Sequence, residues 1–324
     1  MQKIVDISSK IDSIKNDNIE LFLKKKNKSL PTKYLYDEEG SKLFEKICDT
    51  EEYYLTRTEK KILDKNSIDI LSTTKVKEVF ELGSGSSKKT KILIREALKN
   101  NTNFTYSSFD ISDEALQMSF KELYRISKNL NIRLIKGDFM RDLNNLTYHV
   151  NGNARLYLFL GSTIGNFDND IAIKFLSKIS EIMSKKDFFL LGVDNIKDEK
   201  IITSAYNDRL GITKKFNKNI LNVINKKYNS NFKKNKFIHS AKYNSEKSQI
   251  EMYLESITNQ EIKLPNDVSI NIKSGEKILT EISRKFSEET LTMLFNKSNL
   301  KPVKCYSDEK KYFSLYLLKP KIYF

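Results

Sequence analysis

The chain has 324 residues and a formal net charge of +15 at pH 7. This length allows two domains, or one enlarged domain, with a core large enough to need neither disulfides nor metals. Two cysteines and two histidines argue against a disulfide scaffold and a structural zinc site. No segment has the pattern of a signal peptide or a membrane span. We therefore expect a cytoplasmic protein without a membrane partner, and we expect a monomer.

The large positive charge has two explanations. A basic surface is typical of nucleic-acid-binding proteins, but an abundance of lysine, asparagine and isoleucine together is also typical of proteins from AT-rich genomes. The lysines are scattered, the runs at residues 24–26 and 233–234 are short, and no nucleic-acid-binding motif is present. We favour the compositional explanation and expect no nucleic-acid partner.

The N-terminal region carries two segments of interest. Residues 1–29 have a polar, helical pattern without a chemical motif. Residues 37–40 then favour a turn, and Ser41 is placed to cap a helix that carries Phe44. Residues 52–59 are polar and aromatic and open another helix. Their tyrosines fit either a core or the wall of a pocket, because tyrosine combines an apolar face with a hydroxyl group.

The most informative segment is the turn that contains Gly83 and Gly85. The apolar run at residues 76–82 before it is typical of a buried strand of a parallel sheet, and residues 91–98 after it have a helical pattern. The chain has only ten glycines, so two within three positions indicate a backbone need. Such a need arises at a tight turn or where a ligand approaches the main chain closely.

The residues around this turn narrow the choice of ligand. Position 88 is lysine, whereas the phosphate-loop and dinucleotide patterns both require a glycine there. A shortened G-x-G turn suits S-adenosylmethionine, which has no pyrophosphate. The ribose hydroxyls of that cofactor need a carboxylate acceptor, and Asp110 closes the next predicted strand, residues 104–109. Alone, the G-x-G pattern is a weak signal.

The middle of the chain alternates strands and helices. Further strands are predicted at residues 132–135, 155–160 and 188–193, with a helix at residues 171–183. This order predicts a parallel, doubly wound sheet, in which ligands bind beyond the carboxyl ends of the strands. Gly83, Asp110, Asp138 and residues 161–166 all follow such ends, and this coincidence is stronger than any single motif.

The pattern changes after residue 196. Residues 197–232 are helical, residues 236–283 alternate as strands do, and a helix at 287–295 with strands at 303–306 and 312–318 resumes the first pattern. We therefore predict a substrate-binding domain of residues 1–58 and 197–284. Residues 59–196 and 285–324 form the predicted cofactor-binding domain.

Short blocks of sequence, spread from about Leu30 to the C-terminus, match one known family. The blocks are Tyr36-Asp37, Gly40-Ser41, Leu43-Phe44, Glu52-Tyr53-Tyr54, Thr56-Arg57-Thr58-Glu59, Glu81-Leu82-Gly83-Ser84-Gly85-Ser86, Phe109-Asp110-Ile111-Ser112, Gly137-Asp138-Phe139, residues 159–167, Leu191-Gly192-Val193-Asp194, Lys197-Asp198, Ala205-Tyr206, Ile250-Glu251-Met252, Thr280-Glu281-Ile282-Ser283 and Lys285-Phe286. Together they are highly specific. The chain resembles the histidine-specific methyltransferases of ergothioneine biosynthesis.

The resemblance implies a fold, a reaction and two sets of site residues. The fold is α/β: a Rossmann-like class I methyltransferase with a doubly wound, mostly parallel sheet and an inserted α+β substrate-binding domain. Methyl groups pass from S-adenosyl-L-methionine to the α-amino nitrogen of L-histidine three times, giving N-alpha,N-alpha,N-alpha-trimethyl-L-histidine (hercynine) and S-adenosyl-L-homocysteine. The implied cofactor site is Tyr53, Gly83, Lys89, Asp110, Asp138 and Phe139. The implied amino-acid site is Tyr36, Phe44, Gly161, Thr163, Asn166, Tyr206, Met252, Glu281 and Ser283.

The chemistry assigns roles to three of these residues. Methyl transfer to an amine depends mainly on positioning, and the amine must be neutral to attack. Tyr36 is the expected holder of the amine, with a core tyrosine as the alternative. Asn166 and Tyr206 offer donors to the α-carboxylate, although Asn166 also fits a cap for the helix near Asp170. No metal is required.

Glu281 and Ser283 are the candidates for recognising the side chain of the substrate. They lie two apart in the alternating run 278–283, so in a strand they share one face, opposite Ile282. A carboxylate and a hydroxyl match the one donor and one acceptor of a neutral imidazole, and Met252 can pack on the ring. The alternative is a solvated strand face, and the resemblance favours the pocket.

Other functions stay open at this point. Relatives in the same superfamily methylate a prenylated tryptophan, so another amino acid is one alternative. A methyltransferase of protein or RNA is a second, and a non-catalytic protein that binds S-adenosylmethionine or RNA is a third.

Overall fold

The computed structural model describes residues 3–8, 18–100, 103–149 and 154–321. Within these ranges the chain forms two compact units. The first consists of the described residues within 1–10, 55–196 and 286–324, and the second of those within 11–54 and 197–285. None of the described helices combines the length and the apolar character needed to cross a bilayer.

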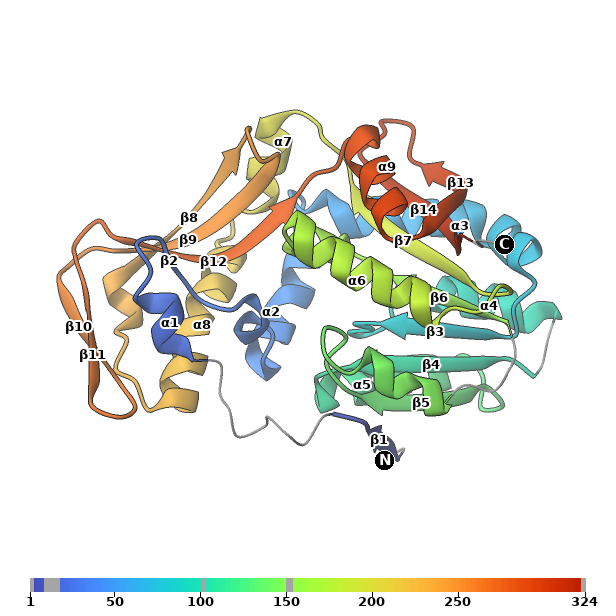
Figure 1. Cartoon of the computed structure of the whole chain (residues 1–324), viewed down its shortest axis with the longest axis horizontal. Helices are drawn as coiled ribbons and strands as arrows, with labels where there is room; N and C mark the ends of the chain where they lie inside the picture. Colours follow the sequence, from blue (N-terminus) through green and yellow to red (C-terminus); the bar gives the residue numbers. More distant parts are fainter. Residues whose placement is uncertain (1–2, 9–17, 101–102, 150–153, 322–324) are drawn as a thin grey trace. The chain divides into compact units, whose positions relative to one another are not determined.

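The first unit is built on a sheet of eight described strands. They are β1 (Ile4–Asp6), β3 (Glu78–Leu82), β4 (Thr105–Asp110), β5 (Asn131–Lys136), β6 (Arg155–Phe159), β7 (Phe188–Asp194), β13 (Leu300–Ser307) and β14 (Phe313–Pro320). Figure 1 shows them in the order β1-β5-β4-β3-β6-β7-β14-β13. All neighbours from β1 to β7 are parallel, whereas β14 and β13 pair antiparallel.

The direction of winding reverses between β3 and β6. From β3 the chain moves outward to β4 and β5, and it then returns to the other side of β3 to form β6 and β7. In doubly wound sheets the ligand site lies at this reversal, beyond the carboxyl ends of the two strands. The residues found there are Gly83 after β3 and the segment that begins at Leu160 after β6. The order confirms the predicted mostly parallel, doubly wound sheet.

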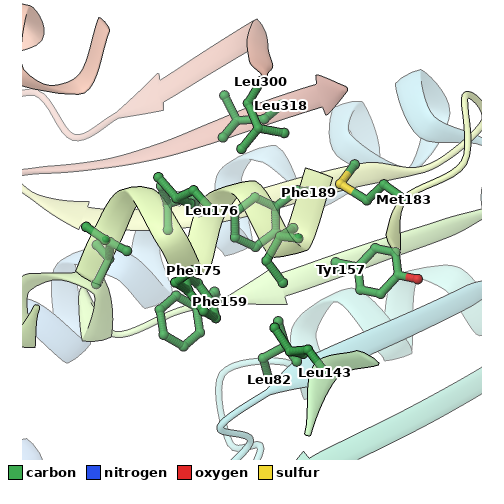
Figure 2. Packing of buried hydrophobic residues seen from close by; sticks show 14 of the residues in the cluster. Leu82, Leu143, Tyr157, Phe159, Phe175, Leu176, Met183, Phe189, Leu300 and Leu318 are labelled. Atoms are coloured by element: carbon green, nitrogen blue, oxygen red, sulfur yellow. The ribbon is translucent and has the colours of Figure 1, made fainter. Parts of the chain in front are cut away.

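Helices cover the sheet of the first unit. They are α3 (Tyr54–Thr74), α4 (Lys91–Asn100), α5 (Asp113–Tyr124), η2 (Leu143–His149), η3 (Thr163–Asn166), α6 (Asn169–Ile182) and α9 (Glu288–Lys297). Alternate residues of β3, β6 and β7 point to one face and pack with the apolar side chains of α6 and α9. Figure 2 shows Phe159 of β6 beside Phe175 of α6, whose ring centroids are 4.6 Å apart.

The second unit combines helices with a four-stranded sheet of order β2-β12-β9-β8 and a separate hairpin of β10 and β11. Its strands are β2 (Lys28–Ser29), β8 (Phe237–Asn244), β9 (Gln249–Ser256), β10 (Gln260–Leu264), β11 (Val268–Ile272) and β12 (Lys277–Arg284). Its helices are α1 (Ile19–Leu23), η1 (Thr32–Leu35), α2 (Glu38–Cys48), α7 (Glu199–Ala205), α8 (Ile212–Tyr228) and η4 (Lys234–Lys236). Helix α8 packs on β8, β9 and α2.

Two N-terminal predictions are wrong. Residues 1–29 were predicted to be helical and residues 1–58 to belong to the substrate-binding domain. Instead, β1 pairs with β5 of the large sheet, so Ile4–Asp6 belongs to the first unit. Only Ile19–Leu23 is helical among the described residues of this stretch, and residues 9–17 lie outside them. A strand of three residues forms only because it pairs with another strand, and the local sequence does not show that pairing.

The predicted cap of α2 is also wrong. The helix begins at Glu38, and Asp37 is its cap, because the Asp37 carboxylate accepts a hydrogen bond from Gly40 N at 2.8 Å. Ser41 therefore lies inside the helix. Gly40 is required by space, since a Cβ there would lie 1.8 Å from the carbonyl oxygen of Leu35.

Candidate functional site

The glycine turn after β3 is held by the carboxylate of Asp110. Gly83 and Gly85 have φ angles of 65° and 51°, in the left-handed region that glycine adopts without strain. The amide of Gly85 donates to Asp110 Oδ2 at 3.0 Å, and the amide of Ser112 donates to Oδ1 at 3.0 Å. Burial raises the pKa of Asp110, and the hydrogen bonds from these main-chain amides partly oppose the rise. The turn and the acid at the end of β4 thus form one structure.

Glu81 anchors the same turn from below. Its buried side chain accepts hydrogen bonds from Thr90 and Tyr106, and from Ser87 Oγ at 3.1 Å. Burial raises its pKa to about 7, and these hydrogen bonds partly oppose the rise. Thr90 directly precedes α4, so Glu81 ties the end of β3 to the start of that helix.

Phe139 closes one side of the turn. Its ring is in edge contact with Phe159 and Phe175, with centroid distances of 5.4 Å and 5.8 Å. A Cβ at Gly83 would lie 3.6 Å from the Phe139 ring, so the main chain of the turn runs along it. The neighbouring Asp138 pairs with Arg141 at 3.2 Å. Gly83, Asp110 and Phe139 therefore lie together, as expected.

Glu59 joins two predicted site residues and was missed by the sequence analysis. This residue of α3 has no exposed surface. Its carboxylate accepts from the amide of Gly161 at 2.8 Å and pairs with the ammonium group of Lys89. Glu59 stands within a block that matched the family, but a helical glutamate gives no sign in the sequence that it is buried.

The segment after β6 is a short 3-10 helix. Ser162 has a φ angle of 57°, and its hydroxyl accepts from the amide of Asp194 at 2.9 Å. Thr163 Oγ1 donates to the carbonyl of Leu160 at 2.9 Å. The cap of α6 is Asp168, which accepts from the amide of Ile171 at 2.8 Å. Asn166 is therefore not the cap of this helix, and that alternative for its role is wrong.

A chain of aromatic rings lines the candidate amino-acid site in the second unit. Its contacts are Phe216–Tyr36 at 5.4 Å, Tyr36–Phe44 at 5.6 Å, Phe44–Tyr53 at 6.1 Å and Tyr53–Tyr206 at 6.2 Å between centroids. Phe216 of α8 was not predicted, because a phenylalanine on the apolar side of a helix has the pattern of a core residue. Tyr53, which was predicted to bind the cofactor, lies among these rings of the second unit.

Polar groups from β12 face the same rings. Tyr36 OH donates to Glu281 Oε1 at 3.2 Å, and Tyr206 OH donates to Ser283 Oγ at 2.7 Å. Burial raises the pKa of Glu281 to about 7, opposed by the Tyr36 hydrogen bond and the charge of Lys285. Burial, together with the nearby Glu281, raises the pKa of Tyr36 well above its usual value.

A β-bulge decides which way Glu281 points. The pairing of β12 with β9 shifts between Leu279 and Glu281, and Thr280 has no opposite residue. Thr280 Oγ1 donates to Asn217 Oδ1 of α8 at 2.6 Å. In a regular strand, the adjacent residues Thr280 and Glu281 would point to opposite faces. The bulge puts both side chains on the face that Thr280 shares with α8, so Glu281 meets Tyr36.

The sequence of residues 15–320 matches the model of a family described as histidine-specific methyltransferase, SAM-dependent. The chain belongs to this family. It is 35% identical over 297 residues to the histidine N-alpha-methyltransferase of Mycobacterium tuberculosis, covering 91% of each chain. It is 30% identical to ergothioneine biosynthesis protein 1 of Schizosaccharomyces pombe, over 89% of this chain and 38% of that protein. It is 26% identical to a 4-dimethylallyltryptophan N-methyltransferase of Claviceps purpurea, over 63% and 62%.

Membership of this family confirms the predicted S-adenosylmethionine-dependent N-methyltransferase activity. The turn after β3 fits the cofactor chemically, because left-handed glycines, an apolar ring and a carboxylate lie together at the reversal of the sheet. Among the described residues, no group of three or more His, Cys, Asp or Glu side chains is able to hold a metal ion.

The predicted site residues fall into two sets. The first unit holds Gly83, Lys89, Asp110, Asp138, Phe139, Gly161, Thr163 and Asn166. The second unit holds Tyr36, Phe44, Tyr53, Tyr206, Met252, Glu281 and Ser283. Three residues predicted to bind the amino acid therefore lie in the same unit as most of the predicted cofactor residues: Gly161, Thr163 and Asn166.

Asp110→Ala should weaken cofactor binding by about 1.5 to 3 kcal/mol, the range for hydrogen bonds to a charged group. The carboxylate also fixes Gly85 and Ser112, so its loss loosens the turn. Calorimetric titration with S-adenosylhomocysteine measures the effect. Asp113→Ala, which removes an exposed carboxylate of α5, is the matched control. Unchanged affinity in folded Asp110→Ala would contradict this role.

Glu281→Gln should change how stability depends on pH. The folded carboxyl, with a pKa of about 7, keeps its proton to higher pH than the unfolded one does, so its stabilising contribution is complete below about pH 4.5 and is lost as the pH rises through 7. The amide has no such loss. Relative to wild type, the variant should therefore gain about 1 to 3 kcal/mol of unfolding free energy between pH 5 and pH 8. Denaturant unfolding at both pH values measures this, and an equal difference at both would refute it.

Proposed function

We propose that the enzyme methylates the α-amino nitrogen of L-histidine three times, giving hercynine for ergothioneine biosynthesis. One observation carries the choice of substrate: a buried carboxylate and a buried hydroxyl, Glu281 and Ser283, face the same set of aromatic rings. A neutral imidazole needs one acceptor and one donor and has a flat apolar face. Few other amino-acid side chains match all three features.

The first unit binds the cofactor in this proposal. Asp110 accepts hydrogen bonds from the ribose hydroxyls, and Gly83 lets the cofactor approach the main chain. Phe139 supplies an apolar surface beside the turn, and Asp138 stands next to it. When bound, S-adenosylmethionine supplies a methyl group on a sulfonium. Lys89 takes its position from Glu59, which also fixes Gly161.

The second unit binds the amino acid. Glu281 accepts from one ring nitrogen, Ser283 serves the other, and the rings of Phe44 and Tyr53 form the walls together with Met252. Tyr206 of this unit provides a polar group for the α-carboxylate, and Asn166 and Thr163 of the first unit provide others in this proposal. A site built on such polar contacts rejects analogues that leave them unpaired.

Tyr36 holds the amine without acting as a base. Its pKa is raised by burial and by Glu281, so the phenol keeps its proton at neutral pH. The hydroxyl donates to Glu281, and in the first two transfers a lone pair on its oxygen accepts from an N–H of the neutral amine. The proton that leaves the amine therefore passes to water, and catalysis is mainly positioning by Tyr36 and Asn166.

Three further properties are part of the proposal. The enzyme acts as a monomer, in the cytoplasm, and without a nucleic-acid partner. In support of the last, the positive charges are scattered along the sequence and no nucleic-acid-binding motif is present.

Incubation with L-histidine and excess S-adenosylmethionine should give the trimethylated product. The amine keeps a lone pair until the third methyl group is added, so transfer continues to three and then stops. Mass spectrometry of the products over time measures this, with the other amino acids tested one by one as controls. A final product with one methyl group, or preference for another amino acid, would overturn the proposal.

Glu281→Ala should reduce kcat/KM for histidine by about 10- to 100-fold, because the ring N–H then lacks its acceptor in a buried site. It should also raise the relative activity on a larger apolar amino acid such as tryptophan. The measurement is the ratio of kcat/KM for the two substrates. Glu255→Ala, which removes a partly exposed carboxylate of β9, is the control. An unchanged ratio in folded Glu281→Ala would remove Glu281 from the imidazole.

A further inference from the structure

A buried lysine beside the candidate amino-acid site has no role in the function proposed so far. Lys285 directly follows β12, and only 2% of its surface is exposed. Its Nζ lies 3.0 Å from Ser283 Oγ and 3.2 Å from Tyr206 OH, and 5.0 Å from the centroid of the Tyr206 ring. An ammonium group has three donors and no acceptor, so both oxygens must accept from it.

These contacts fix the direction of the hydrogen bonds at Ser283. Tyr206 OH donates to Ser283 Oγ at 2.7 Å, and Lys285 donates to the same oxygen. A hydroxyl oxygen has two lone pairs and one hydrogen. Both partners of Ser283 Oγ in the described part of the chain are donors, so its own hydrogen is available for an acceptor. Ser283 therefore presents a donor.

Glu281 presents the opposite character on the same strand. Its carboxyl group accepts from Tyr36 OH, and the charge of Lys285 favours its ionised form, as would an N–H donated by a bound ring. The titratable groups whose charges act on one another around this site are Glu281, Lys285, Tyr36, Tyr53, Tyr206 and Cys48. The three tyrosines are neutral when protonated, so a neutral guest leaves the Glu281 and Lys285 charges balanced.

We propose that Lys285 is a specificity-determining residue, which makes Ser283 a hydrogen-bond donor so that the site accepts the neutral imidazole ring in one tautomer. This inference rests on the proposed function and deepens it. Lys285 acts through Ser283 and Tyr206 and is a positioning residue. One ring nitrogen, with its lone pair, accepts from Ser283, and the other donates its N–H to Glu281.

The same arrangement rejects the protonated ring. An imidazolium has two N–H donors, so one of them would face the Ser283 hydrogen. It would also bring a second positive charge close to Lys285, in a site where burial weakens screening. Rings without an acceptor nitrogen would leave the Ser283 donor unpaired.

A double-mutant cycle tests the connection between Lys285 and Ser283. The variants are Lys285→Met, Ser283→Ala and the two combined, with Lys242→Met of the exposed side of β8 as the control. Calorimetry measures the Kd of L-histidine in the presence of S-adenosylhomocysteine, and circular dichroism checks folding. Each single variant should weaken binding about tenfold, and the double variant should weaken it no further than Ser283→Ala alone.

The outcomes separate this inference from the proposed function. If the two effects on Kd multiply in the double variant, Lys285 acts independently of Ser283. If Kd is unchanged in Lys285→Met, Lys285 has no effect on binding. Either outcome overturns the role of Lys285 and leaves the proposed function standing. A wild-type enzyme that binds no histidine overturns the proposed function and this role with it.

A second measurement needs no variant and holds even if Lys285→Met fails to fold. Histidine labelled with ¹⁵N in the ring is bound to the wild-type enzyme at pH 6, below the usual histidine pKa of about 6.5. Its ¹⁵N spectrum should show one protonated nitrogen and one with a lone pair. Two protonated nitrogens would mean a bound imidazolium and would overturn the proposal. In folded Lys285→Met the balance of charge is lost, so the bound ring should take up the second proton.

Discussion

A buried carboxyl group loses its hydrogen bonds to water and needs hydrogen-bond or charge partners within the protein. Three such residues hold the candidate sites of this protein in place. Glu59 is met by Lys89 and the amide of Gly161, and Glu81 by three hydroxyl groups. Glu281 is met by Tyr36 and Lys285. Each of these carboxyl groups contacts residues of different elements. It therefore fixes the conformation of segments whose local sequence does not determine it. The sites thus owe their shape to buried, hydrogen-bonded carboxyl groups as much as to packing.

The candidate sites of the two units are built from different kinds of groups. The first uses main-chain geometry: left-handed glycines, amides aimed at Asp110 and a reversal of the sheet. Such a site suits a cofactor that approaches the main chain of the protein closely. The second uses side chains: aromatic rings set about Glu281 and Ser283. Side chains can be exchanged without altering the fold, so the proposed function assigns the choice of substrate to this unit.

Supporting contacts make the second arrangement specific. Asn217 accepts from Thr280 in the bulge and donates to the carbonyl of Tyr253 at 3.1 Å, and its side chain also lies 2.8 Å from His239 Nδ1. His239 Nε2 in turn faces the carbonyl of Tyr206 at 3.1 Å, so the loop of Tyr206 and the bulge share one buried network. Burial lowers the pKa of His239, which favours a neutral ring in that network.

The sequence by itself determined the order of the strands and main helices of the first unit from β3 onward, the turn at Gly83 and Gly85, and the acid at Asp110. These features are local: hydrophobic period, glycine spacing and the residue at a strand end can be read within short windows. The family resemblance added the substrate and the two sets of site residues. Only the tertiary structure decided that Ile4–Asp6 joins the large sheet and that Glu59 contacts Lys89 and Gly161. It also decided that Phe216 contacts Tyr36 and that Lys285 lies within hydrogen-bond distance of Ser283. Each of these features depends on a partner far away in the chain. The bulge at Thr280 shows why this matters: one extra residue in β12 puts the adjacent side chains of Thr280 and Glu281 on the same face of the strand.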